Sequence, residues 1–164
     1  MTLTRLFATL KLWLRNLAFT IIAALVVALV TTPITSIANL LWLNSIDMPV
    51  TFATAMQVIL ADWVGLTPAL TIVFSFGLGL AFLAAHLSFP YIQNQIKRQD
   101  WWYELAGALG ILATIIGISE LLFQTQLIGG TRSYFGLILH LAGGALGGWV
   151  FYRLSLRRAQ SQTA

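Results

Sequence analysis

The sequence predicts an all-α membrane protein with four transmembrane helices, a short interfacial helix between spans one and two, and both termini in the cytoplasm. Three observations predict it. Four long stretches carry almost no charge, basic residues lie beside the ends of these stretches that fall on one side of the membrane, and aromatic residues lie near the ends on both sides. Of the 164 residues, 59% are hydrophobic and 9% are charged, whereas soluble domains contain about 25% charged residues. We expect residues 1–164 to form one four-helix transmembrane domain.

The four charge-poor stretches are Asn16–Leu41, Leu66–Phe89, Leu105–Phe123 and Ser133–Tyr152. A helix of about 20 apolar residues crosses the hydrocarbon core of a bilayer. Each stretch is long enough, so we expect spans at about 16–41, 66–89, 105–123 and 133–152. The ionisable side chains within their middle depths are Glu120 and His140. Such groups usually face a partner or water rather than lipid.

The first span has two interpretations. Basic residues precede an apolar run, and small residues follow at Ser36 and Ala38, which resembles a cleaved signal peptide. We favour an uncleaved span because the apolar run continues past Pro33. The outer half is rich in hydroxyls, and it predicts either a kinked or interface-skimming helix end or a polar wall on an outward-facing cavity; these residues are Thr31, Thr32, Thr35 and Ser36.

The distribution of positive charge sets the orientation. With four spans, eight of the nine basic residues fall on one side of the membrane and only Arg132 on the other; the eight are Arg5, Lys11, Arg15, Lys97, Arg98, Arg153, Arg157 and Arg158. Basic residues in short loops mark the cytoplasmic side. We therefore expect an inner-membrane protein with cytoplasmic N- and C-termini. A fifth span at Thr51–Trp63 would split this set, so that segment is interpreted as an interfacial helix, residues 51–63, on the outer face.

Aromatic residues agree with these boundaries. The inner interface is expected to hold Trp13, Trp101, Trp102, Tyr103, Trp149 and Tyr152, and the outer one Trp42, Trp63 and Tyr134. Indole and phenol rings favour the headgroup zone because one edge is polar and the rest is apolar. We interpret all of them as structural anchors.

Small residues recur at helical spacing in spans three and four. The packing set is Ala106, Gly110, Ala113 and Gly117 in span three, and Gly136, Gly143, Gly144, Gly147 and Gly148 in span four. Steps of three and four place such residues on one helix face, where they allow close approach of helices in lipid. We expect spans three and four to form an antiparallel hairpin whose small faces meet each other or a second copy.

The same spacing predicts a polar site in the outer half of the bundle, formed by Glu120, Gln124, Arg132, Tyr134 and His140. One interpretation is structural, with a Glu120–Arg132 ion pair and His140 bonded to a backbone carbonyl. Another is a site for a proton, an ion or a lipid headgroup. A third is simple exposure at the outer interface.

No catalytic, cofactor or metal motif is recognisable in the sequence. It has no cysteine, no hydrolase elbow, no phosphate-binding loop and no metal-binding histidine spacing. The basic residues flank spans, so no nucleic-acid partner is expected. The sequence favours a non-enzymatic role as a self-associating bundle or an accessory subunit of a membrane complex. The alternatives are a small-solute, ion or proton transporter using Glu120, Arg132 and His140, and a membrane enzyme acting on a lipid headgroup near the outer leaflet.

Overall fold

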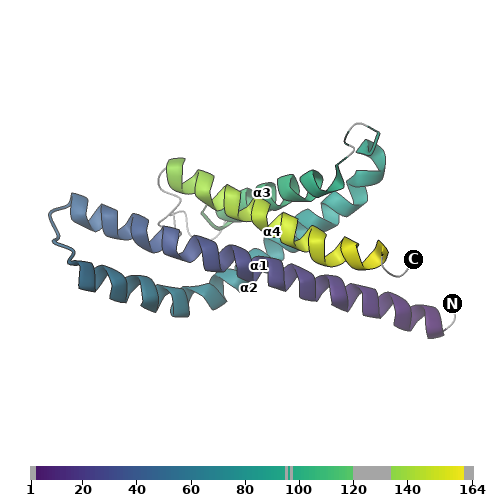
Figure 1. Cartoon of the computed structure of the whole chain (residues 1–164), viewed down its shortest axis with the longest axis horizontal. Helices are drawn as coiled ribbons and strands as arrows, with labels where there is room; N and C mark the ends of the chain where they lie inside the picture. Colours follow the sequence, from purple (N-terminus) through teal and green to yellow (C-terminus); the bar gives the residue numbers. More distant parts are fainter. Residues whose placement is uncertain (1–2, 95, 97, 120–133, 161–164) are drawn as a thin grey trace.

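The structure, a computed structural model, describes residues 3–94, 96, 98–119 and 134–160. Four helices form in these residues, with no strand among them: α1 (Leu3–Ser45), α2 (Phe52–Ile92), α3 (Gln99–Gly117) and α4 (Tyr134–Gln160). Successive helices run in opposite directions (Figure 1). In the described residues, α1 contacts α2 and α4, and α3 contacts the same two helices from the other side. The expected all-helical fold is confirmed.

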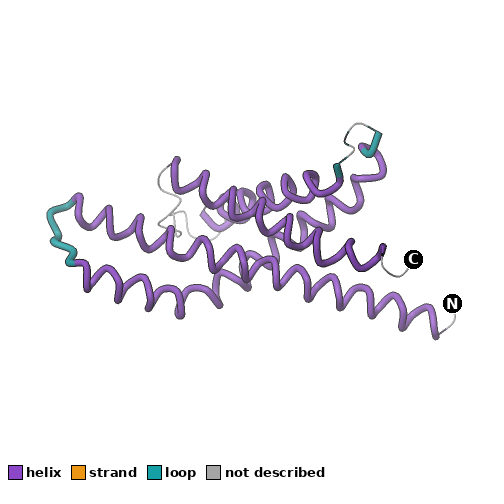
Figure 2. Tube along the Cα trace, in the orientation of Figure 1, coloured by secondary structure: helices purple, strands orange, loops and turns teal. Residues whose placement is uncertain are grey.

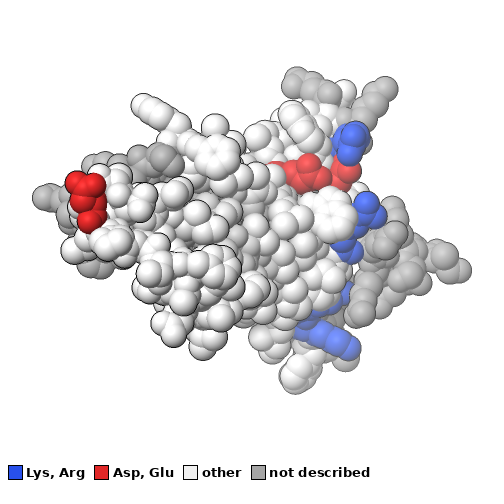
Figure 3. Space-filling view, turned by 60° about the vertical axis from the view of Figure 1, so that its left-hand side comes forward, with Lys and Arg blue, Asp and Glu red and all other residues white. Residues whose placement is uncertain are grey.

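Three of these helices are long and apolar enough to cross a membrane, judged on the described residues. They are Leu10–Ser45, Phe52–Ile92 and Tyr134–Ser155. Figure 3 shows that charged side chains gather towards the two ends of the molecule, with an uncharged belt between them. The membrane character predicted from composition is therefore confirmed.

The structure corrects the expected interfacial helix. Residues 51–63 do not form a separate element, because one helix runs from Phe52 through Pro68 to Ile92. Proline removes one backbone donor, yet a membrane helix tolerates that loss when neighbouring groups satisfy the freed carbonyl. The helix changes direction part-way along instead of ending there (Figure 2).

The turn between α1 and α2 is sharply defined. Asp47 has a positive φ of 58°, and the Met48 N–H donates to the Leu43 carbonyl oxygen at 3.2 Å. This is the Schellman pattern that ends helices, with aspartate where glycine is commonest. Thr51 then caps α2 by accepting a hydrogen bond from the Thr54 N–H. The two helices consequently form a hairpin that extends beyond the start of α4 (Figure 1).

The core lies where all four helices meet. From α1 it takes small residues, and from the other helices larger ones; its members are Ala23, Ala24, Val27, Ala28, Phe74, Leu78, Phe82, Ala85, Tyr103, Ile111, Ile115 and Phe151. Phe82 stacks on Phe151 with ring centroids 4.3 Å apart, and Tyr103 lies 5.6 Å from Phe151. Tyr103 is only 2% exposed, so it is a core residue of α3 rather than the interface anchor that the sequence suggested.

Candidate functional site

The polar face of α1 is buried inside the bundle. Its four hydroxyls are at most 5% exposed, and they belong to Thr31, Thr32, Thr35 and Ser36. Each hydroxyl oxygen lies 2.7 to 3.2 Å from the backbone carbonyl oxygen four residues earlier, and each can donate its single proton there unless it donates to another partner. A hydroxyl satisfied within its own helix lies in an apolar bundle at little cost. These groups therefore form a wall between helices, which differs from the interface-skimming helix end that the sequence favoured.

Pro33 interrupts the backbone bonding of α1 beside this wall. Because proline has no N–H, the carbonyl four residues earlier, that of Leu29, loses its helical partner. The indole Nε1–H of Trp63 on α2 donates to this oxygen at 3.0 Å. A side chain of the neighbouring helix thus replaces the missing backbone donor.

Two further hydrogen bonds join the same wall to α2. The hydroxyls of Thr32 and Thr67 lie 3.3 Å apart, and each of these threonines precedes a proline, Pro33 or Pro68. Ser36 donates to the Asp62 carboxylate at 2.7 Å. The two Thr-Pro steps are thus at one level of the bundle, and a carboxylate lies near them.

His140 joins α4 to this wall. It is fully buried; its Nδ1 lies 2.7 Å from the Gly136 carbonyl oxygen and its Nε2 lies 3.3 Å from the Thr35 hydroxyl. A carbonyl only accepts, so Nδ1 carries a proton. With a neutral ring, Nε2 accepts from Thr35. With a protonated ring, Nε2 donates to Thr35, whose own proton is directed to the Thr31 carbonyl, so the geometry fits both protonation states.

Of the other residues in the predicted polar site, three lie outside the described residues: Glu120, Gln124 and Arg132. Tyr134 begins α4 and is 89% exposed, in contrast to the buried His140. The side chain that contacts His140 is Thr35 of α1. The sequence analysis had considered the α1 hydroxyls only as a polar wall on a cavity, separate from the predicted polar site. The missed contact is specific: Thr35 and His140 are far apart in sequence, and no local pattern links them.

The small residues of α3 and α4 face three different helices. Between α3 and α4, Gly107 lies against Gly144, and Gly148 lies against the Tyr103 backbone. A methyl group added at Gly144 would lie 2.6 Å from the Gly107 carbonyl oxygen. The contact therefore depends on Gly107, which the predicted α3 face omitted. The sequence could have indicated this face, because Tyr103, Gly107 and Ile111 recur at intervals of four residues and so share one side of α3.

The remaining members of that set lie elsewhere. Gly110 faces Gly77 and Ala81 of α2, while Gly143 and Gly147 face Val27 of α1. Gly136 supplies the carbonyl that His140 binds, and Gly117 has no neighbouring atom within 4 Å of an added methyl. Ala106 and Ala113 line a groove between α2 and α3.

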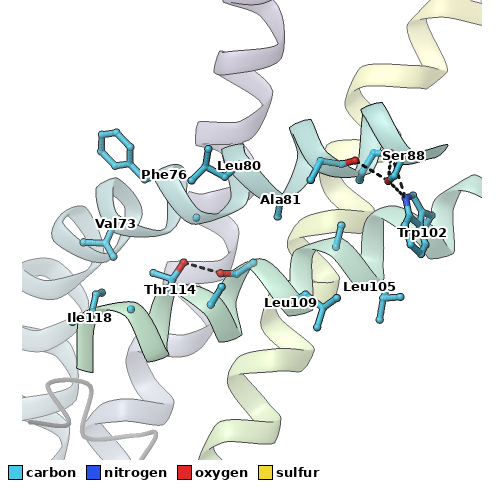
Figure 4. Close-up of a pocket in the computed structure, with 17 residues that line it drawn as sticks. Val73, Phe76, Leu80, Ala81, Ser88, Trp102, Leu105, Leu109, Thr114 and Ile118 are labelled. Carbon is cyan, nitrogen blue, oxygen red and sulfur yellow. Dashed lines mark hydrogen bonds between the residues drawn. The ribbon is translucent and has the colours of Figure 1, made fainter. Parts of the chain in front are cut away.

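That groove has a volume of about 850 Å³. Small residues of α2 and α3 form much of its lining, including Gly77, Ala81, Gly110 and Ala113, and Figure 4 shows Phe76, Leu80 and Leu109 along it. Its polar members are already engaged: Thr114 donates to Gly110, and Trp102 donates to Ser88. The groove therefore offers an apolar surface and few groups for a polar ligand.

In the part of the chain that the structure describes, no three His, Asp or Glu side chains come close enough to hold a metal ion. No protein-family model, no curated protein and no solved structure matches this chain.

Proposed function

We propose that the protein is a non-catalytic membrane component that associates with a second copy of itself through the groove between α2 and α3. The observation that carries this proposal is the groove itself, which is apolar and lined by small residues. Apolar surfaces of this kind in lipid favour close helix packing. In this proposal α3 also crosses the membrane, because its 19 residues reach about 28 Å at 1.5 Å per residue.

The same chain offers a ridge that matches the groove. Exposed side chains follow one face of α4 at steps of three and four: Phe135, Ile138, Ala142, Leu146 and Trp149. They extend over about 21 Å. Within one copy Leu78 lies against Gly147 and Phe82 stacks on Phe151, so the part of the ridge from Ala142 to Trp149 lies level with the part of the groove that begins at Val73. Two copies inserted with the same orientation can place the ridge of one along the groove of the other, in a head-to-tail contact.

The proposed orientation has both termini in the cytoplasm of a cell with an inner membrane. Lys11 and Arg15 lie in the first part of α1, Arg98 precedes α3 and Arg153 lies in the last part of α4, whereas Asp47 lies in the turn between α1 and α2. Figure 3 shows basic side chains at one end of the molecule. Short basic segments remain on the cytoplasmic side. Reporter fusions at the C-terminus and at the α1–α2 turn test this orientation, and a cytoplasmic turn would contradict it.

Disulfide cross-linking tests the head-to-tail contact, since the chain has no native cysteine. Leu80→Cys lies beside the groove and Leu146→Cys lies on the ridge at a similar depth; their side chains are 70% and 38% exposed. Co-expression of the two single-cysteine variants should give a cross-linked dimer in native membranes. The matched control pairs Leu80→Cys with Leu25→Cys on α1, which is also exposed, and should give much less.

A groove-filling variant gives a second measurement. Ala113→Trp places a large side chain in the groove and should abolish the Leu80–Leu146 cross-link, while Ala18→Trp on α1 should leave it intact; both alanines are exposed. Equal cross-linking in every pair, or a monomer in mild detergent, would contradict the proposal. Cross-linking of Leu80→Cys only to a different protein would show an accessory subunit of another complex and would rule out the second copy as the occupant.

Transport of a proton or small ion is a second candidate function, favoured by one observation. The His140–Thr35 contact fits both protonation states of the ring, and it lies within a wall of hydroxyls that continues through Ser36 to Asp62. Ionisable groups inside membrane bundles often line ion paths. Flux into liposomes should fall in His140→Ala and Asp62→Asn if this function holds. Unchanged flux in both variants, or no flux above empty liposomes, removes it.

A further inference from the structure

The N-terminal part of α1 and the C-terminal part of α4 bring basic side chains to one end of a shared seam. Three of these side chains are described, Lys11, Arg15 and Arg153, and we call them the basic seam. Lys11 and Arg153 are exposed, and Arg15 is half-buried. Arg157 and Arg158 follow Arg153 in α4.

Contacts along α1 and α4 fix which residues lie opposite each other. His140 bonds to Thr35, and Gly147 lies against Val27 and the Ala23 carbonyl. Continued along the antiparallel pair, this register places Arg15 within about 7 Å of Arg153 along the helix axis, at 1.5 Å per residue. Arg15 and Arg153 therefore lie at similar depths on neighbouring helices, and Lys11 lies one turn of α1 nearer the N-terminus than Arg15.

Arg15 has an unused donor in the basic seam. Its Nε is buried and has no hydrogen-bond partner among the described residues. A buried guanidinium donor without an acceptor is costly, and oxygen atoms of a phosphate group are its best partners. Arg15 thus lacks an acceptor of the kind that an anionic headgroup supplies.

Each of the two helices places a tryptophan near its basic residue, and by the register above Trp13 lies about 16 Å from Trp149 along the helix axis. Trp149 lies under the Arg153 guanidinium, whose Cζ is 5.1 Å from the ring centroid. Trp13 precedes Arg15 on α1 and is 63% exposed. Indole rings favour the boundary between acyl chains and headgroups, so basic groups beside them face phosphate rather than bulk water.

Arg98 at the same end of the bundle is different. It forms an ion pair with Asp100, with Nη2 2.8 Å from Oδ2, and the hydrogen bond from Arg98 lowers the pKa of the Asp100 carboxyl. Its charge is already matched by a neighbour in the fold. Arg98 therefore provides an internal control for the effect of basic charge alone.

From these contacts we infer that the basic seam binds the phosphate of an anionic phospholipid, with Arg15 donating from the α1 side and Arg153 from the α4 side. Each basic residue near a membrane surface strengthens the attraction to anionic lipid by about fivefold in affinity. The basic residues line neither the α2–α3 groove nor the α4 ridge, although Trp149 beside Arg153 is a ridge residue. A variant that no longer self-associates would leave the lipid-binding inference intact. A variant that no longer binds the lipid would likewise leave the proposed self-association intact.

Native mass spectrometry of the full chain in detergent tests the site, with phosphatidylglycerol compared to phosphatidylcholine of the same acyl chains. The wild type should retain phosphatidylglycerol preferentially. Arg15→Gln should reduce that preference about fivefold, consistent with one lost basic contact, while Arg98→Gln should leave it unchanged. Arg15→Lys keeps the charge and should retain part of the preference. Circular dichroism confirms that each variant is folded.

Three outcomes would overturn the inference. The first is equal retention of the two lipids by the wild type. The second is an equal loss in Arg15→Gln and Arg98→Gln, which would show only diffuse attraction to a basic end. The third is complete displacement of phosphatidylglycerol by inorganic phosphate, which would assign the site to a free anion.

Discussion

The indole N–H of Trp63 on α2 donates to the Leu29 carbonyl on α1, and Pro33 is the reason that this carbonyl is free. The two helices are therefore joined where one of them lacks a backbone hydrogen bond. The contact also explains how α1 continues through a proline as one helix from Leu3 to Ser45.

Removal of the indole donor should destabilise the α1–α2 hairpin. Trp63→Phe keeps the ring but leaves the Leu29 carbonyl unsatisfied, at a cost of about 1–2 kcal/mol in the free energy of unfolding. Unfolding in mixed micelles by graded addition of SDS measures it. Trp13→Phe, at an exposed position of α1, should change stability by less than about 0.5 kcal/mol.

A double-mutant cycle isolates the proline. Pro33→Ala restores a backbone N–H that reaches the Leu29 carbonyl, so the cost of Trp63→Phe should fall by at least about half in that background. An undiminished cost in Pro33→Ala would mean that Trp63 stabilises the hairpin through packing and not through this hydrogen bond.

Close packing of α3 on α4 should depend on glycine. Gly144→Ala places a methyl 2.6 Å from the Gly107 carbonyl oxygen, and backbone on both sides leaves it nowhere to move, so a loss of about 1–3 kcal/mol is expected. Gly117→Ala is the matched control, because no atom of the described residues lies within 4 Å of its added methyl. It should change stability by less than about 1 kcal/mol. Similar losses in both variants would contradict the packing described between these helices.

The Thr35–His140 contact should stabilise the pairing of α1 with α4. Thr35→Val keeps the shape of the side chain and removes the hydroxyl, and hydrogen bonds between membrane helices contribute about 0.6 kcal/mol on average and up to about 1.7. Thr71→Val serves as the control, since the Thr71 hydroxyl bonds only to Thr67 of its own helix in the described contacts. The same SDS titration measures both variants, and a Thr71→Val cost equal to that of Thr35→Val would count against the interhelical bond.

Replacement of Asp47 should stabilise the turn between α1 and α2. Its φ of 58° is the left-handed conformation that glycine adopts without strain, so Asp47→Gly should raise stability by about 0.5–1 kcal/mol. Asn44→Gly, three residues earlier within α1, has no such strain to relieve and should lower stability by a similar amount. A loss of stability in Asp47→Gly would show that the aspartate side chain itself holds the turn.

The fold was largely predictable from the sequence, whereas the contacts of the candidate site were not. The charge-poor stretches predicted helices because a long apolar segment partitions into lipid, where a helix satisfies its backbone hydrogen bonds internally. The separation of residues 51–63 from span two was wrong because the charge distribution excluded only a fifth span, and it could not exclude one long helix that continues through Pro68. The α3 packing face was displaced by one residue, from Ala106 to Gly107, since adjacent small residues give two overlapping spacings.

What the sequence alone determined is the environment of this chain: its helical class, its apolar belt and the gathering of its basic residues at one set of helix ends. Only the tertiary structure decided which polar groups meet, as in Ser36 with Asp62, Thr35 with His140 and Trp63 with Leu29. The physical reason is that partition into lipid depends on the sum of side-chain hydrophobicity along a segment. A hydrogen bond between helices depends instead on the rotation and register of two segments, which are set by all the packing contacts together.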